Sequence, residues 1–433
     1  MLSDSALKVL YRLDQAGFEA YLVGGCVRDS LLGQIPKDFD IATSATPEQV
    51  RGVFRNARII GRRFRIVHVR FGREIIEVTT FRGGHDSDQA ERHAQQSEEG
   101  LLLRDNVWGR VDEDALRRDF TVNALYYSIR DFAIHDWTGG IEDIEQRVLR
   151  LIGDPALRYR EDPVRMLRAV RFASKLDFTL APETQAPLEE YAHLLLQIPS
   201  ARLFEEVLKL FLSGHAVSTF HGLRRYNLFA MLFPETEGAF KHLGWAQTLV
   251  EQALANTDAR IRADKPVTPA FLYGALLWPA VVHQTSELID RGIPPVPASQ
   301  QAQQQVISHQ LQHTSIPRRF SLPMREIWDM QLMLPRRRGK RPFQTLAHTR
   351  FRAAYDFLLL RESAGEIPSG LGQWWTRFQE VSEQEQREMV QVVEQSGSAI
   401  EEESEAPPES MPLPRRKPRR RRRKRSGPPP GSE

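Results

Sequence analysis

The pattern of hydrophobic and polar positions divides the chain into a mixed first part and a helical second part. Short apolar runs bounded by glycine or polar clusters, such as residues 18–23, 66–71 and 74–81, are typical of strands. From about residue 200 the apolar positions recur with a helical period. Residues 200–214 open on a serine, carry one apolar face and close on a glycine. The pattern predicts alternating short helices and strands, followed by a region that is helical throughout.

Changes in this pattern predict four segments. Residues 1–130 alternate short helices and strands, and residues 131–200 begin with a short strand pair at 132–137 before turning helical. Residues 201–395 are helical, and residues 396–433 are polar, charged and rich in proline. A chain of 433 residues can bury a large core and is long enough for two or three such units.

Charged residues are unevenly distributed near the C-terminal end of the sequence. The formal net charge is +3, but residues 401–409 hold five glutamates and residues 415–425 hold ten lysines or arginines. Without these two blocks and Glu433, residues 1–400 carry 49 basic and 50 acidic side chains. Blocks of like charge with proline and serine are expected to be disordered. A ten-cation tail suits RNA phosphates, although an acidic protein or membrane lipid would also attract it.

Composition excludes several classes of protein. Cys26 is the single cysteine, so an intrachain disulfide is impossible, and a reducing, cytoplasmic location is expected. Cys26 has no base beside it in the sequence and is predicted to be a small packing residue. There is no signal-peptide pattern. The longest apolar stretch, residues 270–282, is too short to span a bilayer, so no membrane partner is expected.

Candidate chemistry begins at the run Gly24-Gly25-Cys26-Val27-Arg28-Asp29. The preceding strand, 18–23, ends at the two glycines, and a helix is expected to follow. Glycines let backbone N–H groups approach a ligand closely, and a helix N-terminus attracts anions. Arg28 adds a fork of donors that suits phosphate oxygens. The run predicts a triphosphate site formed by Gly24, Gly25 and Arg28.

Asp38 and Asp40 follow in the sequence Lys-Asp-Phe-Asp-Ile-Ala. Residues two apart on a strand point to the same face. Two carboxylates on one face provide oxygen ligands for Mg²⁺, which prefers carboxylates together with substrate phosphates. The alternative is a solvated strand face with two repelling charges, but the neighbouring glycine turn favours the metal.

At this point the chain resembles the family of bacterial poly(A) polymerases and class II tRNA CCA-adding enzymes. The resemblance rests on Gly-Gly-x-Val-Arg-Asp, on Asp-x-Asp, and on residues 117–124, Arg-Arg-Asp-Phe-Thr-Val-Asn-Ala. It implies an α+β fold: a polymerase-β-like nucleotidyltransferase head with a small mixed sheet, then an all-α neck and body. It also implies that Asp38 and Asp40 bind two Mg²⁺ ions, which activate the RNA 3′-hydroxyl and steady the leaving pyrophosphate.

The resemblance also calls for a third carboxylate, for which there are two candidates. Glu77 lies in a β-branched strand expected to pair with residues 66–71, from where it could face the aspartate pair. Asp119 lies in the Arg-Arg-Asp motif, where with Arg118 it could organise the triphosphate and ribose. Its alternative role is an ordinary helix N-cap. Glu77 is the candidate metal ligand and Asp119 the candidate catalytic residue, but the choice of third ligand stays open.

A further motif begins at Glu161-Asp162-Pro163, and the arginines Arg165, Arg168 and Arg171 recur every three residues after it. At 100° per residue they share one stripe of a helix. The segment could be an amphipathic helix with wet arginines. It also resembles the family's Glu-Asp-x-x-Arg motif, which contacts the incoming base. Asp162 could accept from an exocyclic amine, Arg165 could donate to a ring acceptor, and Arg168 and Arg171 would face the triphosphate.

The hydrogen-bonding edges of adenine and cytosine both satisfy that motif, so it cannot separate poly(A) from CCA addition. Residues 59–69, which include Gly61-Arg62-Arg63-Phe64, resemble a stretch that marks the poly(A) polymerases. The sequence therefore predicts a template-independent enzyme that transfers AMP from ATP to RNA 3′ ends. The alternatives are a CCA-adding enzyme and a non-catalytic RNA-binding protein. The resemblance suggests RNA-decay enzymes and RNA chaperones as partners, and leaves oligomeric state open.

Overall fold

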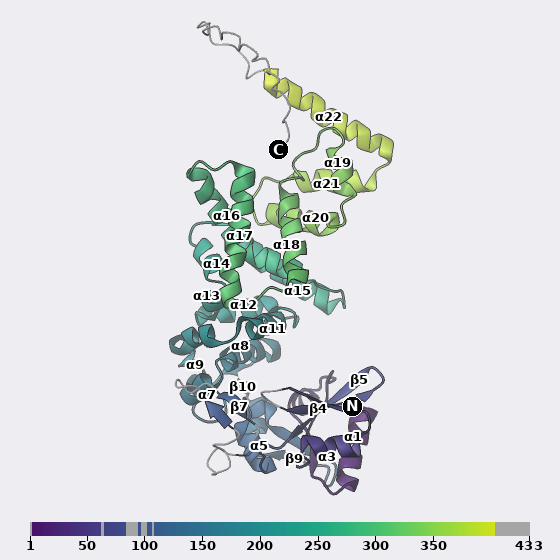
Figure 1. The fold of residues 1–433 in the computed structure, drawn as a ribbon, viewed down its shortest axis with the longest axis vertical. Helices are drawn as coiled ribbons and strands as arrows, with labels where there is room; N and C mark the ends of the chain where they lie inside the picture. Colours follow the sequence, from purple (N-terminus) through teal and green to yellow (C-terminus); the bar gives the residue numbers. More distant parts are fainter. Residues whose placement is uncertain (1, 62–64, 84–93, 97–101, 106–107, 403–433) are drawn as a thin grey trace, which may run out of the picture.

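The computed structural model describes residues 2–61, 65–83, 94–96, 102–105 and 108–402. The molecule is elongated. Figure 1 shows a sheet-containing head at one end, helices stacked along the long axis, and the last helix at the opposite end. This order follows the chain, so the mixed first part and the helical second part expected from the sequence are confirmed.

The head is built on one seven-stranded mixed sheet. Only β2 and β5 are parallel neighbours in it, and every other neighbouring pair is antiparallel. Across the sheet the strands are β3 (Ala57–Ile60), β4 (Ile66–Phe71), β5 (Glu74–Thr80), β2 (Asp40–Thr43), β1 (Ala20–Val23), β8 (Leu125–Ser128) and β9 (Ile134–Asp136).

The two faces of this sheet differ in chemistry. Leu22, Ile41 and Val78 lie on the face that joins the main hydrophobic core, and α1 (Asp4–Gln15) and α3 (Pro47–Val53) cover it. Because side chains alternate along a strand, their neighbours Asp40 and Glu77 belong to the other face. That second face carries only a small apolar cluster around Val23, Ala42 and Tyr126. The acidic side chains Asp40 and Glu77 therefore share the second face of the sheet.

Short elements connect the head to the first long helix of the neck. Gly25–Leu31 forms α2, Val111–Arg117 forms α5 and Gly140–Glu145 forms α6. The remaining elements are β6 (Ala94–Gln96), β7 (Leu102–Asp105), η1 (Thr121–Asn123), β10 (Val148–Leu149), α7 (Pro155–Glu161), α8 (Val164–Leu176) and β11 (Thr179–Leu180). β6 pairs with β7, and β10 pairs with β11.

Helices make up the rest of the described chain, as the periodicity predicts. They are α9 (Pro182–Gln185), α10 (Leu188–Tyr191), η2 (Ala192–Gln197), α11 (Ser200–Phe211), α12 (Ala216–Arg225), α13 (Leu228–Leu232), α14 (Pro234–Ala239), α15 (Ala246–Arg262), α16 (Pro269–Asp290), α17 (Pro295–His313), α18 (Arg318–Gln331), α19 (Arg341–Leu346), α20 (Phe351–Ser363), α21 (Leu371–Glu380) and α22 (Glu383–Glu402). One hydrophobic core runs continuously from α1 to α20, and a second cluster packs α18 to α22.

Two expected boundaries differ from the observed elements. The head sheet includes β9, so it continues past residue 130, because Ile134–Asp136 pairs with β8 instead of starting a separate unit. Helix α22 continues to Glu402, into the segment expected to be a disordered tail. The distinguishing residues Arg62, Arg63 and Phe64, and residues 403–433, lie outside the described residues. Within the described residues, no helix is both long and apolar enough to cross a bilayer.

Candidate active site

The predicted glycine turn joins β1 to α2. Gly24 has a φ of +82°, a conformation that side-chain-bearing residues rarely adopt, so glycine is required there. A Cβ on Gly24 would lie 3.8 Å from Nη1 of Arg118. The strand, the turn and the helix are therefore as predicted, and the Arg118 guanidinium lies beside the turn.

Arg28 from α2 is almost fully buried, with 2% of its surface exposed. Its Nε donates to Oδ1 of Asp29 at 2.8 Å, and its Nη1 donates to Oδ1 of Asn123. Its guanidinium also lies 5.3 Å from the ring centroid of Phe172 in α8. Arg28, which was expected to bind phosphate, thus makes contacts within the protein that hold α2 to η1 and α8.

The acidic pair stands at the start of β2. The strand begins at Asp40, so Asp38 precedes it and is exposed, while Phe39 between them is buried in the core. Asp40 and Glu77 are direct partners across the parallel β2 and β5 pair. Nε2 of His68, on β4, contacts Oε1 of Glu77 at 3.1 Å. Of the two candidates for a third carboxylate, Glu77 is the one beside Asp40.

Within this group, the pKa of Asp40 is shifted from its ordinary value. Its burial, together with the negative charges of Glu77 and Asp38, raises the pKa of Asp40 to about 6, against the opposing effect of Arg118. A bound cation would offset the repulsion between these carboxylates and favour their charged forms.

Among the described residues, this acidic group is the candidate for holding a metal. The described residues contain no set of three or more His, Cys, Asp or Glu side chains arranged to enclose a metal ion. Mg²⁺ does not need one, because it is usually held by one or two carboxylates, waters and substrate phosphates. The donors at Asp38 and Asp40 fit that pattern, with Glu77 adjacent.

Asp119 lies between α5 and η1 and is held by other protein groups. Its Oδ2 accepts from Nε of Arg168 at 2.8 Å, and its Oδ1 accepts from the Phe120 amide at 2.8 Å and from Nδ2 of Asn123 at 3.2 Å. Burial alone would raise the pKa of Asp119, but the Arg168 charge and these hydrogen bonds lower it to about 2. In this arrangement Asp119 positions Arg168 and Asn123.

Arg118 forms a triangle with two residues that the sequence reasoning did not single out. Its Nε donates to the Tyr126 hydroxyl at 2.6 Å and its Nη2 donates to Oδ2 of Asp114 at 3.1 Å. The Tyr126 hydroxyl in turn donates to the same Asp114 oxygen at 2.6 Å. This triangle fixes the Arg118 guanidinium next to Gly24.

The predicted base-reading residues lie at the junction of α7 and α8. Asp162 ends α7, and its Oδ2 accepts from Nη2 of Arg202 in α11 at 2.8 Å. Nη1 of Arg165 donates to Oε2 of Glu161 at 2.9 Å. Both side chains are held by neighbours, so each is oriented in advance of any ligand.

Arg168 and Arg171 share one aromatic neighbour. Their guanidinium carbons lie 5.2 Å and 4.5 Å from the ring centroid of Phe172, within the range of a cation–π contact. Burial and the charge of Arg168 lower the pKa of Arg171 to about 10, and Nε of Arg171 has no hydrogen-bond partner in the described part of the chain. With Arg28, these side chains form a cationic cluster between head and neck, well suited to an anion.

Sequence reasoning missed several residues that support the site. Each of them orients a predicted arginine or aspartate through the contacts given above. They are Asp29, Asp114, Tyr126, Phe172 and Arg202. The spacing of Asp114 and Arg118, four residues apart, was a signal of an ion pair on one helical face. Cys26 behaves as predicted: it is buried, and burial raises the pKa of its thiol to about 11.

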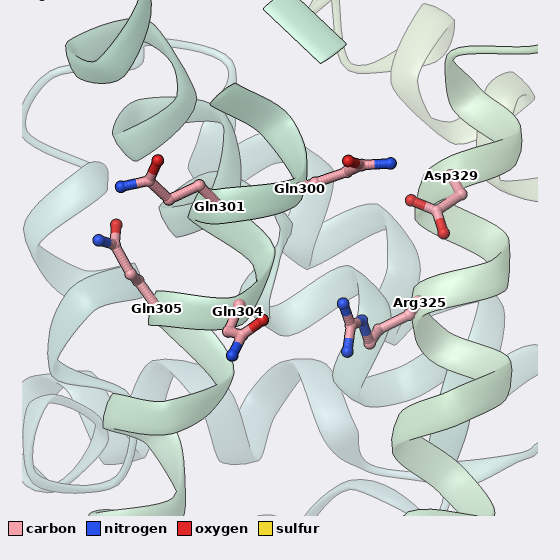
Figure 2. Close-up of a pocket in the computed structure, with 6 residues that line it drawn as sticks. All are labelled: Gln300, Gln301, Gln304, Gln305, Arg325 and Asp329. Carbon is pink, nitrogen blue, oxygen red and sulfur yellow. The ribbon is translucent and has the colours of Figure 1, made fainter. Parts of the chain in front are cut away.

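A separate cavity of about 520 Å³ lies in the body between α17 and α18. In Figure 2, Gln300 and Gln304 extend from α17 toward Asp329 and Arg325 of α18. Gln301 and Gln305 complete the lining. None of the predicted site residues lines this cavity, which is therefore distinct from the acidic site of the head.

Comparison with known proteins decides the family. Family models match three parts of the chain: "Poly A polymerase head domain" at residues 20–150, "Probable RNA and SrmB- binding site of polymerase A" at 177–240, and "Polymerase A arginine-rich C-terminus" at 291–426. Poly(A) polymerase I of Salmonella typhimurium is 49% identical over 396 residues, covering 90% of this chain and 85% of that protein. The enzyme of Haemophilus influenzae is 46% identical over 90% of this chain and 87% of its own length.

The chain belongs to the bacterial poly(A) polymerase I family. CCA-adding enzymes are more distant in sequence: that of Lactobacillus helveticus is 39% identical over 50% of this chain and 51% of its own length. The shared fold extends further. The crystal structure of the Bacillus stearothermophilus CCA-adding enzyme with CTP superposes with a TM-score of 0.56 and 28% identity, covering 86% of this chain and 80% of that one. The predicted nucleotidyltransferase head and helical neck and body are thereby confirmed.

Proposed function

We propose that this protein adds AMP from ATP to RNA 3′ ends without a template and releases pyrophosphate, through a site built around Asp38 and Asp40. The observation that carries the proposal is the group of three carboxylates next to the turn at Gly24: Asp40 and Glu77 share one face of the head sheet, and Asp38 lies just before the strand. Relatives that are named poly(A) polymerase I match nine-tenths of the chain, which supports ATP and RNA as the substrates.

Asp38 and Asp40 would hold Mg²⁺, with Glu77 beside them as a candidate third ligand. When bound, Mg²⁺ polarises the attacking hydroxyl and neutralises charge on the leaving pyrophosphate, and a second ion can share this work. The pKa of Asp40, raised to about 6 in the metal-free site, means that protons compete with Mg²⁺ for this carboxyl increasingly as the pH falls toward and below that value.

The remaining predicted residues would position ATP. Gly24 and Gly25 let the triphosphate approach the backbone at the start of α2, and Arg118 is fixed beside that turn. Arg171 and Arg168 extend the positive charge toward the neck. Asp119 keeps Arg168 in place, which is a positioning role.

Asp162 and Arg165 would read the adenine edge. An ionised carboxylate accepts from the exocyclic amine and a guanidinium donates to a ring nitrogen, so the pair matches adenine's donor and acceptor pattern. Arg202 and Glu161 hold the two side chains in place. Cytosine offers a related pattern, so CCA addition remains the second candidate and is supported by the fold shared with CCA-adding enzymes.

A single extension assay tests the proposal. The full-length protein is incubated with an unstructured oligoribonucleotide, or with a tRNA that lacks its 3′ end, and with each triphosphate separately in the presence of Mg²⁺. Long tracts from ATP alone, with pyrophosphate release, are expected on both RNAs. Products that require CTP and stop after three residues would instead identify CCA addition. No pyrophosphate release would identify a non-catalytic RNA-binding protein.

Association with RNA-decay enzymes and RNA chaperones is part of this proposal. Its support is the match of residues 177–240 to a family model whose description includes RNA and SrmB binding. Co-purification from cell extract before and after ribonuclease treatment would separate direct protein partners from proteins bridged by RNA.

A further inference from the structure

An aromatic cluster lies on the head sheet, and apart from Tyr126, which holds Arg118, its rings have no role in the site described above. Tyr21, Tyr126, His135 and Trp137 contact one another in pairs with ring centroids 5.4 to 6.0 Å apart. Phe81 adds a fifth ring at 6.0 Å from Tyr21. We call the outer pair of this cluster, His135 and Trp137, the aromatic platform.

The sheet register places the platform on the catalytic face. Asp40 is opposite Val23, Val23 is opposite Tyr126, and Tyr126 is opposite His135. Directly opposed residues on neighbouring strands share a face, so His135 lies on the same face as Asp40 and in the same row across the sheet. Three strand spacings separate them, about 14 Å in all.

The direction of the strands brings Trp137 to the same end of the sheet. β2 starts at Asp40, and the antiparallel β1 ends beside it at Val23. β8 then runs away from this end, and β9 runs back toward it. Trp137 directly follows β9, so it lies at the end of the sheet where Asp40 and the Gly24 turn also lie.

The platform is packed against a buried ring and is partly exposed to solvent. The rings of His135 and Trp137 are nearly parallel, with an interplanar angle of 16° and 5.6 Å between centroids. Tyr126, which is fully buried, meets Trp137 edge-on from below at 75°. Nε2 of His135 is held by Oδ2 of Asp131 at 3.0 Å. Trp137 nevertheless keeps 38% of its surface exposed, so part of it is accessible to a ligand.

We propose that the aromatic platform stacks a nucleobase of the RNA primer close to its 3′ end. Stacking on aromatic rings holds single-stranded nucleic acid without choosing among bases, because every base has a π-face. An enzyme that extends any 3′ end needs such sequence-tolerant grip near its metal ligands. The span of about 14 Å corresponds to roughly two to four nucleotide spacings, so the stacked base would be about the third to fifth from the 3′ end. The inference rests on the proposed function, because it assumes an RNA primer at Asp40.

The test compares three variants of the full-length protein in ATP-dependent extension of a short, unstructured RNA. Trp137→Ala removes the ring, Trp137→Phe keeps a stacking surface, and Tyr11→Ala removes an exposed ring from α1, which packs against the opposite face of the sheet. Trp137→Ala should raise the KM for RNA roughly five- to a hundredfold, the range of one lost stack. The KM for ATP should stay within about twofold of wild type. Trp137→Phe should recover most of the loss, and Tyr11→Ala should behave as wild type.

Primers with one abasic nucleotide locate the stacked position. An abasic site at that position should weaken wild type as much as Trp137→Ala does, and should weaken Trp137→Ala no further, because both remove the same contact. Thermal unfolding of each variant detects damage to the fold.

The stacking proposal would be overturned if Trp137→Ala left the KM for RNA unchanged or raised the KM for ATP as much as the KM for RNA. It would also be overturned if Trp137→Ala and the abasic site had additive effects at every primer position. The same holds if Trp137→Phe lost as much activity as Trp137→Ala and both variants had lower thermal stability. If wild type itself extends no RNA, the proposed function fails and not the platform alone.

Discussion

Asp119 accepts a hydrogen bond from Arg168 over 2.8 Å and so ties the segment after α5 to helix α8 of the neck. The pair belongs to a longer chain of contacts. Asp119 also accepts from Asn123, and Asn123 accepts from Arg28 of α2. A carboxylate that the sequence suggested as catalytic is therefore central to how the head and the neck are held together.

This ion pair leads to a pH-dependent prediction. The pKa of Asp119 is lowered to about 2, below its ordinary value of 3.8. A depressed carboxyl pKa contributes stability above the unfolded-state pKa and loses it as pH falls through the folded-state value. Asp119→Asn should therefore lower the free energy of unfolding by roughly 2 kcal/mol at pH 7, and by about half as much near pH 3.

Urea unfolding at both pH values measures this difference. Asp177→Asn is a suitable control, because Asp177 is almost fully exposed and its positive φ tolerates asparagine. If Asp119→Asn loses activity with the same stability as wild type at pH 7, Asp119 acts on substrate and is not a positioning residue.

Replacing Asp40 should change the free energy of unfolding in the opposite direction from replacing Asp119. Its pKa is raised to about 6, so the charged form is disfavoured in the folded protein, and the cost is fully present above pH 6. Asp40→Asn removes that charge. Without divalent metal at pH 7.5, we expect the variant to be more stable than wild type by roughly 1–2 kcal/mol. Adding Mg²⁺ and ATP should stabilise wild type more than the variant.

The same substitution should abolish AMP transfer while leaving RNA binding nearly intact. A loss of roughly a thousandfold or more corresponds to about 4 kcal/mol of transition-state stabilisation. Asp38→Asn should behave alike in activity, and Glu145→Gln, an exposed acid on α6, should be neutral. Comparable AMP transfer by either aspartate variant would refute the metal assignment.

Arg28 illustrates where sequence reasoning reached its limit. The glycine turn, the strand and the helix around it follow from local pattern, and so does the helical body, whereas Asp38 was expected on the same strand as Asp40 and instead precedes it. What Arg28 bonds to could not be read locally, because Asn123 is 95 residues away and becomes a neighbour only when β8 pairs with β1. Phe172 received no interpretation from the sequence: Arg168 and Arg171 are its neighbours on α8 itself, but its contact with Arg28 of α2 exists only in the folded structure.

Arg28→Lys should therefore reduce stability. A lysine cannot reproduce the planar fork that donates to both Asp29 and Asn123, and it leaves buried acceptors without partners. We expect the free energy of unfolding to fall by about 2–4 kcal/mol. Arg12→Lys, on exposed α1, provides the matched control. A raised KM for ATP in a variant of wild-type stability would show that Arg28 contacts the triphosphate directly.

Asp162 should control the choice of base. Asp162→Ala removes the proposed acceptor for the exocyclic amine and also releases Arg202. We expect kcat/KM for ATP to fall roughly tenfold to a hundredfold, with a smaller fall for inosine triphosphate, which lacks that amine. Arg202→Ala distinguishes the two effects, because it leaves the carboxylate in place and removes only its contact with Arg202. Equal losses with both triphosphates would mean that Asp162 only supports the fold.

The C-terminal charge should set the salt dependence of RNA binding. Helix α22 ends at Glu402, and the ten cations lie beyond it at residues 415–425, so truncation after Glu402 removes them without cutting a helix. Each phosphate contact on single-stranded RNA contributes about 0.7 to the slope of log affinity against log salt concentration. If even half of the cations engage RNA, the slope should decrease by roughly 3 or more.

A short primer should still be extended, because the acidic group of the head is intact. Truncation after Arg425 removes only uncharged residues and Glu433, and serves as the control. An unchanged slope after truncation at Glu402 would mean that RNA binding depends on the folded head, neck and body alone.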